Sequence, residues 1–360
     1  MTKTFQTHPL DLYEIRSRIA GSLCLKDLAS CARVSQDWND SFTPPLYKSV
    51  VLSKNGPSIE SVERNKHLIQ RLEIQKFTSH NVIFSIMAYP KLAILHLNYT
   101  IRDNGAQALS EALKTNSTLT TLRLTNNSIG SNGVQALSEA LKTNSTLTSL
   151  DLWKNSIGSN GAQALSEVLK INSTLTTLKL YGNSIKYDGT QALSEALTIN
   201  STLITLSLWR NCIEFDGAQA LSKELKTNST LNNLDLQETS IDENGAQVPS
   251  DALKINSTLT TLKMGRNWVE DNGVQVLSEA LKIDSTLTTL DLSTNSFGVN
   301  GTQALSDALK VNVAYLPCGS LDRWRHMNSG GTTEVFSATL TFNLRRSGYQ
   351  TPYKRNHKPA

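Results

Sequence analysis

The sequence predicts an α/β solenoid of stacked strand–helix repeats, and three observations support this fold class. The stretch LTTLRLTNNSIGSNGVQALSEALKTNST, which begins at Leu119, recurs nearly letter for letter every 28 residues as far as Leu287. Its leading leucines alternate with polar residues, which is typical of a short strand with one buried face. Its later apolar residues follow helical spacing, so each copy ends in an amphipathic helix. Because one unit cannot bury both apolar faces alone, stacked copies are expected to share one core.

The repeat wording identifies a family. A period of roughly 20–29 residues with the frame L-x-x-L-x-L-x-x-N-x-I is the signature of leucine-rich repeats. The 28-residue length and the wording from Gly158 to Thr174, G-x-x-G-A-Q-A-L-S-E-A-L-K-x-N-x-T, resemble the ribonuclease-inhibitor class of these repeats. The resemblance covers residues 92–312. It implies a ribonuclease-inhibitor-like horseshoe, with parallel strands on the concave side and helices on the convex side.

Residues 1–47 are predicted to form a separate helical module. Leu12, Ile15, Ile19 and Leu23 are at helical spacing, and Pro44-Pro45 ends the segment. A bundle of about 40 residues is near the lower limit for independent stability, so it would gain from a partner.

The wording of this module resembles an F-box, in a chain of the F-box/leucine-rich-repeat type known from fungi. The matching residues are Leu12, Glu14-Ile15, Ile19, Leu23, Asp27-Leu28, Val34-Ser35, Trp38 and Leu46-Tyr47. The resemblance implies docking on the SCF adaptor, and through it on the cullin, by Leu12, Glu14, Ile15, Leu23, Leu28, Val34 and Trp38. Tyr13 departs from the family's proline in the segment that meets the adaptor, and Gln36 and Tyr47 also depart from the pattern. The alternative is a helical cap over the first repeat.

Less regular segments flank the array. Residues 48–91 are expected to be a linker with degenerate entry repeats, because Ile69, Leu72 and Ile74 match the strand frame. After Asn312 the pattern stops. Residues 313–360 hold seven Lys or Arg against two acidic residues, and we expect a basic, disordered tail.

One copy within the array has two departures. Pro249 stands where the other copies have a core leucine, and proline inside a helix costs ~3 kcal/mol or more. Thr239 replaces an asparagine that, in related solenoids, satisfies backbone groups between coils. The two changes predict a soft point in this copy; the alternative is drift in a tolerant, redundant array.

Composition excludes several classes of function. The chain has a formal net charge of +4, of which the tail contributes +5, so the solenoid lacks the positive charge of a nucleic-acid binder. Four scattered cysteines, no signal peptide and no long apolar run predict a cytoplasmic or nuclear protein with no membrane contact. The array from Leu97 to Arg325 has no histidine, and no phosphate-binding or zinc motif occurs. We therefore expect no catalytic residues, no cofactor and no metal.

The variable strand positions predict a partner-binding surface on the concave face. Because the copies are nearly identical, the positions that differ between them stand out. The position directly after Leu152, Leu180 and Leu208 holds Trp153, Tyr181 and Trp209 in three adjacent copies. Exposed aromatic rings beside Lys and Arg are typical of interface hot spots. The predicted partner-binding residues are Asp151, Trp153, Lys154, Lys179, Tyr181, Trp209, Arg210, Arg266 and Trp268. The alternative is that the stacked rings only stabilise the sheet.

A further expectation concerns the charged position between Leu122 and Leu124 and its equivalents in the other copies. It reads Arg123, Asp151, Lys179, Ser207, Asp235, Lys263 and Asp291 in successive copies, so its charges nearly alternate. Cross-strand ion pairs along this ladder would each contribute about 0.2–1 kcal/mol.

Taken together, the resemblances imply a non-enzymatic substrate-recognition subunit of an SCF-type ubiquitin ligase. The F-box-like module would dock on the adaptor, and the solenoid would hold a substrate protein. The competing interpretation is a leucine-rich-repeat scaffold or regulator with no ligase link. A GTPase-activating protein or an enzyme inhibitor is a third possibility, although fold alone does not carry function.

Overall fold

The computed structural model describes residues 47–53, 57, 59–75, 85–98, 101–311 and 339–341. The predicted adaptor-binding residues, from Leu12 to Trp38, lie outside the described residues. So does most of the predicted basic tail.

The strands form one sheet whose spatial order is the order of the chain. Ten of them pair in parallel: β1 (Ser49–Leu52), β2 (Arg71–Ile74), β3 (Ile94–Leu97), β4 (Thr121–Arg123), β5 (Ser149–Asp151), β6 (Thr177–Lys179), β7 (Thr205–Ser207), β8 (Asn233–Asp235), β9 (Thr261–Lys263) and β10 (Thr289–Asp291). From β4 to β10 the register pairs residues 28 apart, such as Leu122 with Leu150. Equivalent positions of successive repeats therefore lie side by side on one face.

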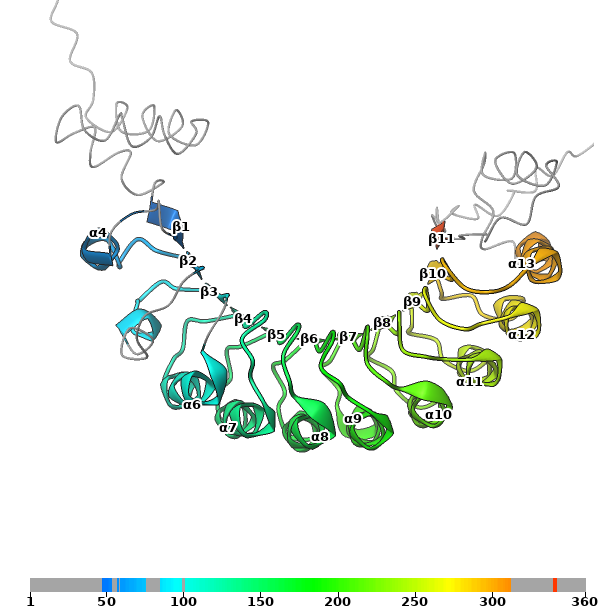
Figure 1. The fold of residues 1–360 in the computed structure, drawn as a ribbon, viewed down its shortest axis with the longest axis horizontal. Coiled ribbons are helices and arrows are strands. Elements are labelled where there is room, and N and C mark those ends of the chain that lie inside the picture. Colours follow the sequence, from blue (N-terminus) through cyan, green and yellow to red (C-terminus); the bar gives the residue numbers. More distant parts are fainter. Residues whose placement is uncertain are drawn as a thin grey trace, which may run out of the picture.

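The helices form a second layer outside the sheet. They are α4 (Ile59–Arg64), α6 (Arg102–Leu113), α7 (Ser131–Leu141), α8 (Gly158–Leu169), α9 (Tyr187–Ile199), α10 (Glu214–Leu225), α11 (Glu243–Leu253), α12 (Asp271–Leu281) and α13 (Val299–Val311). Figure 1 shows the strands along the inner side of an arc and the helices along its outer side. This arrangement confirms the predicted solenoid. None of the described helices combines the length and hydropathy that a membrane crossing needs.

The core lies between the two layers and repeats once per unit. In the repeat that begins at Leu119, the strand leucines Leu119, Leu122 and Leu124 are fully buried, and Leu137 and Leu141 of α7 are buried against them. Side chains of a strand alternate between its faces, so the residues between these leucines point to the concave side.

Each strand ends where the backbone enters the left-handed region. The residue two positions after the last strand leucine, which is Met264 in one copy, has φ between 52° and 61° in every copy: Asn126, Lys154, Gly182, Arg210, Glu238, Arg266 and Thr294. Only one of these seven is glycine, although this region costs other residues about 1–2 kcal/mol. The cost is accepted because the chain must turn here from the concave face toward the helix layer.

The two flanks of the array also contribute strands. In the expected entry repeats, Ile69, Leu72 and Ile74 are buried, and β1 and β2 extend the parallel sheet. At the other end, residues 339–341 form β11 (Thr339–Thr341), which pairs antiparallel with β10. This strand lies within residues 313–360, the segment predicted to be a basic tail.

The loop asparagines, such as Asn127, Asn155 and Asn183, form a buried ladder that joins successive repeats, as predicted from the sequence. The side-chain oxygen of Asn155 accepts from the backbone N–H groups of Asn127 and Ile129, both at 3.0 Å. Its amide donates to the carbonyls of Leu124 and Leu152, both at 2.8 Å. Because Leu124 belongs to the preceding repeat, each such asparagine holds two coils together.

A second asparagine ladder lies at the ends of the helices. Asn144 is buried; its oxygen accepts from the N–H groups of Thr146 (3.1 Å) and Leu147 (2.9 Å), and its amide donates to the Leu113 carbonyl (2.8 Å). The equivalent residues are Asn116, Asn172, Asn200, Asn228, Asn256 and Asp284, and each accepts from the N–H of the following strand leucine. The recurring Asn-Ser-Thr wording therefore has a structural cause.

The copy with two departures interrupts the first ladder. The Thr239 hydroxyl donates within its own repeat, to the Leu236 carbonyl at 2.6 Å, whereas an asparagine would also reach the preceding repeat. Pro249 lies inside α11 and lines an apolar internal cavity of about 10 Å³ together with Leu221 and Leu253. The missing asparagine bond and the cavity both lie between the same two repeats, those that contain α10 and α11.

Candidate functional site

Three aromatic rings form one cluster on the concave face. Trp153, Tyr181 and Trp209 each follow a strand by two residues, in three adjacent repeats. The Tyr181 ring lies 4.4 Å from the Trp209 ring and 5.2 Å from the Trp153 ring, with interplanar angles of 65° and 78°. These edge-to-face contacts are favourable for aromatic pairs. Trp153 remains 40% exposed, so the cluster is available to a partner.

The cluster borders an open groove of about 500 Å³ on the concave face. Of the predicted partner-binding residues, the groove brings together Asp151, Trp153, Lys179, Tyr181 and Trp209. Among the lining residues that sequence reasoning did not assign to the site are Arg123, Ser207, Asp235 and Lys263. They occupy the charge-ladder position of neighbouring strands, so extending that position along the sheet would have found them.

The expected ion pairs along the charge ladder are absent. The register places Arg123 beside Asp151 and Asp151 beside Lys179, as predicted. However, no ion pair within 4 Å involves Arg123, Lys179 or Lys263 in the part of the chain that the structure describes. The prediction of cross-strand pairs is therefore wrong.

The acidic side chains of the ladder bond to the backbone instead. Asp151 accepts from the Trp153 N–H at 3.1 Å, Asp235 from the Gln237 N–H at 3.2 Å, and Asp291 from the Ser293 N–H at 2.9 Å. Each carboxylate thus satisfies the N–H of the residue two positions ahead, where the strand ends. Short polar side chains commonly form this local bond. It fixes the backbone of Trp153, so Asp151 helps to position the aromatic cluster.

The remaining predicted residues lie at the edge of the groove or away from it. The Lys154 ammonium lies 5.6 Å from the centre of the Trp153 ring, within the range of a cation–π contact. Arg210 donates to the Tyr181 hydroxyl at 3.3 Å and lies 3.8 Å from the Glu238 carboxylate. Arg266 pairs with the same Glu238 at 3.4 Å.

Trp268 is separate from the cluster, although it is 65% exposed. It lies two residues beyond Arg266, after the left-handed turn that ends the strand segment. The groove therefore does not include it.

Burial shifts the pKa of one carboxyl group in the groove. The pKa of Asp235 is raised, mainly because burial removes water from the charged form, while the Gln237 N–H and the Lys263 charge oppose the shift. Trp209 also has a buried indole N–H with no hydrogen-bond partner among the described residues.

A buried histidine continues the charge ladder toward the N-terminus. His96 pairs in register with Glu73 and Arg123, and it is 6% exposed. Burial lowers its pKa to about 4, and the charges of Arg123 and Arg71 act in the same direction. The Glu73 carboxylate, 3.8 Å away, opposes the shift only in part. His96 is thus neutral in the folded protein at physiological pH.

This pKa predicts acid sensitivity of the fold. The unfolded chain takes up a proton near pH 6.5 and the folded chain near pH 4, so the free energy of unfolding falls as the pH drops through that window. We expect a loss of about 2 kcal/mol at pH 5 relative to pH 7. Urea unfolding of wild type and His96→Gln at both pH values measures it. An equal loss in the variant would contradict the assignment to His96.

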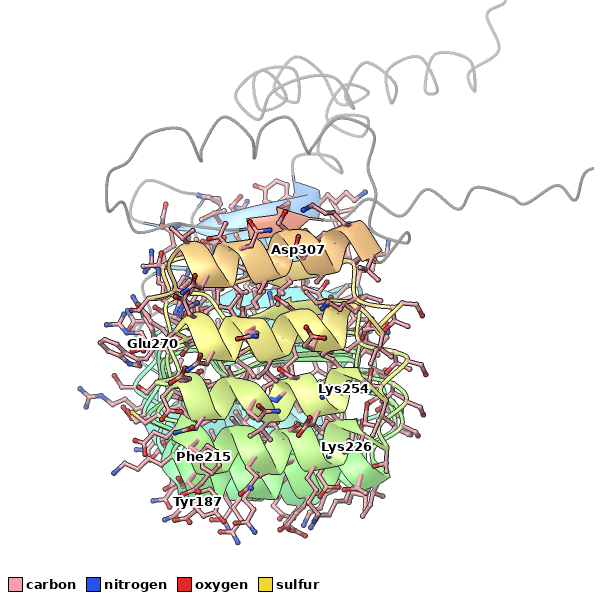
Figure 2. All side chains as sticks on the ribbon, turned by 90° about the vertical axis from the view of Figure 1, so that its right-hand side faces the viewer. Tyr187, Phe215, Lys226, Lys254, Glu270 and Asp307 are labelled. Carbon is pink, nitrogen blue, oxygen red and sulfur yellow. The ribbon has the colours of Figure 1, made fainter. Side chains whose placement is uncertain are left out.

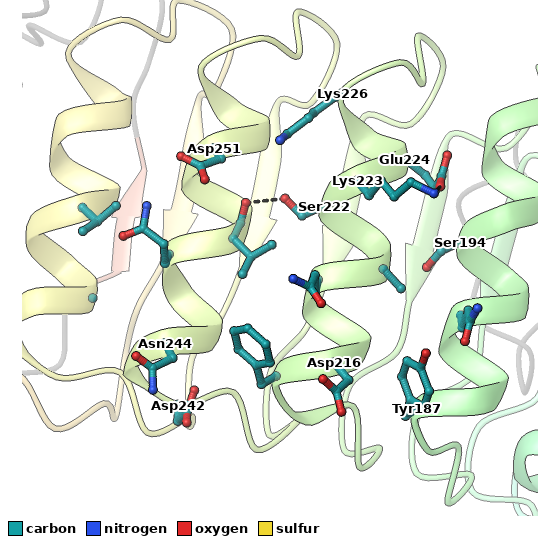
Figure 3. Close-up of a pocket in the computed structure, with 18 of the residues that line it drawn as sticks. Tyr187, Ser194, Asp216, Ser222, Lys223, Glu224, Lys226, Asp242, Asn244 and Asp251 are labelled. Atoms are coloured by element: carbon teal, nitrogen blue, oxygen red, sulfur yellow. Dashed lines mark hydrogen bonds and ion pairs between the residues drawn. The ribbon is translucent and has the colours of Figure 1, made fainter.

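A second hollow lies on the convex side, across α9, α10 and α11. It encloses about 1000 Å³ and is lined by Tyr187 and Phe215, which are exposed, and by the polar residues labelled in Figure 3. Figure 2 shows these two rings near one end of the helices and Lys226 and Lys254 near the other. The hollow is open, and two of its acidic side chains, Asp216 and Glu243, are in the first turns of α10 and α11, where carboxylates stabilise the helix dipole.

Comparison with known proteins identifies the repeats. The family model described as Leucine Rich repeat matches residues 115–138, 143–166, 172–194, 256–278 and 284–306. The matched stretches skip residues 195–255, which contain Thr239 and Pro249. No curated protein matches the sequence.

Solved structures resemble the fold at low identity. One is Leiomodin-1 Actin-Binding Site 2 (ABS2), at 17% identity and a TM-score of 0.27, covering 61% of this chain and 90% of that chain. Another is the crystal structure of a TLR13-ssRNA13 complex, at 18% identity and a TM-score of 0.45, covering 73% of this chain and 35% of that chain. At these scores neither bears on what this chain binds. The matched repeats and the parallel sheet covered by helices together show that the array is a leucine-rich-repeat solenoid.

Proposed function

We propose that this chain is a non-enzymatic interaction protein that holds a partner protein on the concave face of its solenoid. The observation that carries the proposal is the Trp153–Tyr181–Trp209 cluster beside an open groove. Such a groove suits a protein segment better than a small metabolite, because small-molecule sites enclose most of their ligand. Large rings with charged neighbours are also the side chains that dominate protein interfaces.

We further propose that the captured protein is a substrate of an SCF-type ubiquitin ligase. The F-box-like wording of residues 1–47 supports this step. The chain would then act by proximity, because it would raise the effective concentration of the substrate near the ligase. The alternative is a scaffold or regulator without a ligase, in which the same concave surface binds its partner.

The concave site predicts which substitutions weaken capture. We expect Trp153→Ala and Trp209→Ala each to reduce partner capture about thirtyfold, since truncating a hot-spot aromatic costs roughly 2 kcal/mol or more. Quantitative mass spectrometry of proteins that co-purify with the tagged full chain measures the loss. Thr125→Ala and Ser293→Ala stand at the same repeat position in outlying copies and should change little. Similar small effects in all four variants, with unchanged melting temperatures, would rule out the aromatic site.

The ligase assignment has its own test. We expect the full chain to bind purified SCF adaptor, and Ile15→Asp to abolish that binding, because a buried carboxylate would replace an apolar contact. The solenoid's circular dichroism should stay unchanged. Failure of the wild-type chain to bind any adaptor of this type would leave the scaffold alternative, and the concave site would be unaffected.

A further inference from the structure

The cations and the carboxylates of the concave groove differ in their bonding. Arg123 on β4, Lys179 on β6 and Lys263 on β9 line the groove. None of the three has an ion pair within 4 Å among the described residues. Several surface lysines elsewhere in the array do have partners, for example Lys170 with Glu167 at 2.8 Å on the convex side. The Lys263 charge acts on Asp235 of the neighbouring strand, so the cations of the groove are only partly compensated within the chain.

The two acidic residues of the groove cannot offset this charge fully. Asp151 is only 8% exposed and is bonded to the Trp153 N–H. Asp235 is bonded to the Gln237 N–H and lies 3.4 Å from the Ser207 hydroxyl. Asp151 is buried and Asp235 is half-buried, whereas Arg123 and Lys179 are exposed and Lys263 is half-buried. A ligand approaching from the concave side meets cations and aromatic rings.

The spacing of the cations follows from the register. The three residues occupy the same position of their strands, and Lys179 lies two strands from Arg123 and three from Lys263. With about 4.8 Å between strands, the separations along the sheet are about 10 Å and 14 Å. An extended peptide advances about 3.3 Å per residue and its side chains alternate between two faces, so side chains that face the groove are an even number of residues apart. Spacings of two and four residues, about 7 Å and 13 Å, come nearest to the two separations, and the long Arg123 side chain can take up the difference.

Resting on the proposed function, we propose that the concave groove captures an extended acidic segment of the partner protein, lying across the strands. Its carboxylates stand at positions i, i+2 and i+6, on one face of the segment, opposite Arg123, Lys179 and Lys263. An apolar side chain at i+4, on the same face and just beyond the middle carboxylate, rests on the Trp153–Tyr181–Trp209 cluster.

Synthetic peptides test this inference on the full chain. The probe is a fluorescein-labelled Gly/Ser peptide with Glu at i, i+2 and i+6 and Leu at i+4. The first control has the same composition with adjacent glutamates, and the second has Lys in place of Glu. We expect the patterned acidic peptide to bind at least about tenfold more tightly than either control, with an affinity that falls as salt rises. Equal binding of all three peptides would overturn the proposal.

Protein variants separate this inference from the proposed function. Lys179→Glu and Lys263→Glu should each weaken the acidic peptide about tenfold, whereas Lys226→Glu, the same charge change on the convex side, should not. Cellular partners whose capture requires Trp209 but is unchanged by Lys179→Glu would refute the acidic class and leave the concave site in place. Capture that neither Trp209→Ala nor Lys179→Glu changes would refute the proposed site itself.

Discussion

Replacing Asn155 with alanine is expected to lower the free energy of unfolding by about 4 kcal/mol. The Asn155 side chain accepts two backbone N–H groups at 3.0 Å and donates to two carbonyls at 2.8 Å. Alanine would leave these four backbone groups without their partner in a buried site, and each such group costs roughly 1–3 kcal/mol. Partial relaxation and water entry keep the total below the sum.

A surface asparagine in the neighbouring helix provides the matched control. Asn132 is exposed in the first turn of α7, and Asn132→Ala should change stability by less than about 0.5 kcal/mol. Urea unfolding followed by circular dichroism compares the two variants. Equal, small effects would show that the asparagine ladder contributes little to the contact between coils.

The repetition explains how much of the fold the sequence predicted. A 28-residue period fixes the register of a parallel sheet, because equivalent residues must lie side by side when the copies stack. The alternating leucines then determine which side of each strand is buried. For the same reason the adjacency of Trp153, Tyr181 and Trp209 could be predicted from three aligned copies.

Local backbone chemistry explains what the sequence did not predict. Charge alternation alone suggested cross-strand ion pairs, but Asp151 is short enough to bond its own backbone at the end of the strand. Trp268 looked like part of the aromatic surface, but the left-handed residue Arg266 turns the chain before it. The buried role of Asn144 was likewise not predicted, because polar residues such as those of Asn-Ser-Thr are mostly exposed in proteins. In each case the position of the side chain depends on the local backbone conformation at the end of a strand or helix, which the residue pattern does not determine.

The second large effect concerns the interrupted repeat, where replacing Pro249 with leucine is expected to stabilise the protein by about 4 kcal/mol. Proline has no N–H to donate to the Gly245 carbonyl, and inside a helix it costs ~3 kcal/mol or more. Leucine at this position packs fully buried in the neighbouring helices, as Leu221 and Leu277 do. It would also fill the cavity of about 10 Å³ beside Pro249.

Two further variants divide this gain into its causes. Pro249→Ala restores the N–H without filling the cavity, so it should give about 3 kcal/mol, and the remaining difference measures packing. Thr239→Asn would restore the missing bond to the preceding repeat and add about 1 kcal/mol independently. Native-state hydrogen exchange should show α11 as the least protected of the interior helices in wild type and as protected as α12 in Pro249→Leu. Wild-type protection of α11 equal to that of α10 and α12, together with no gain in any of the three variants, would mean that the array has absorbed both departures without a soft point.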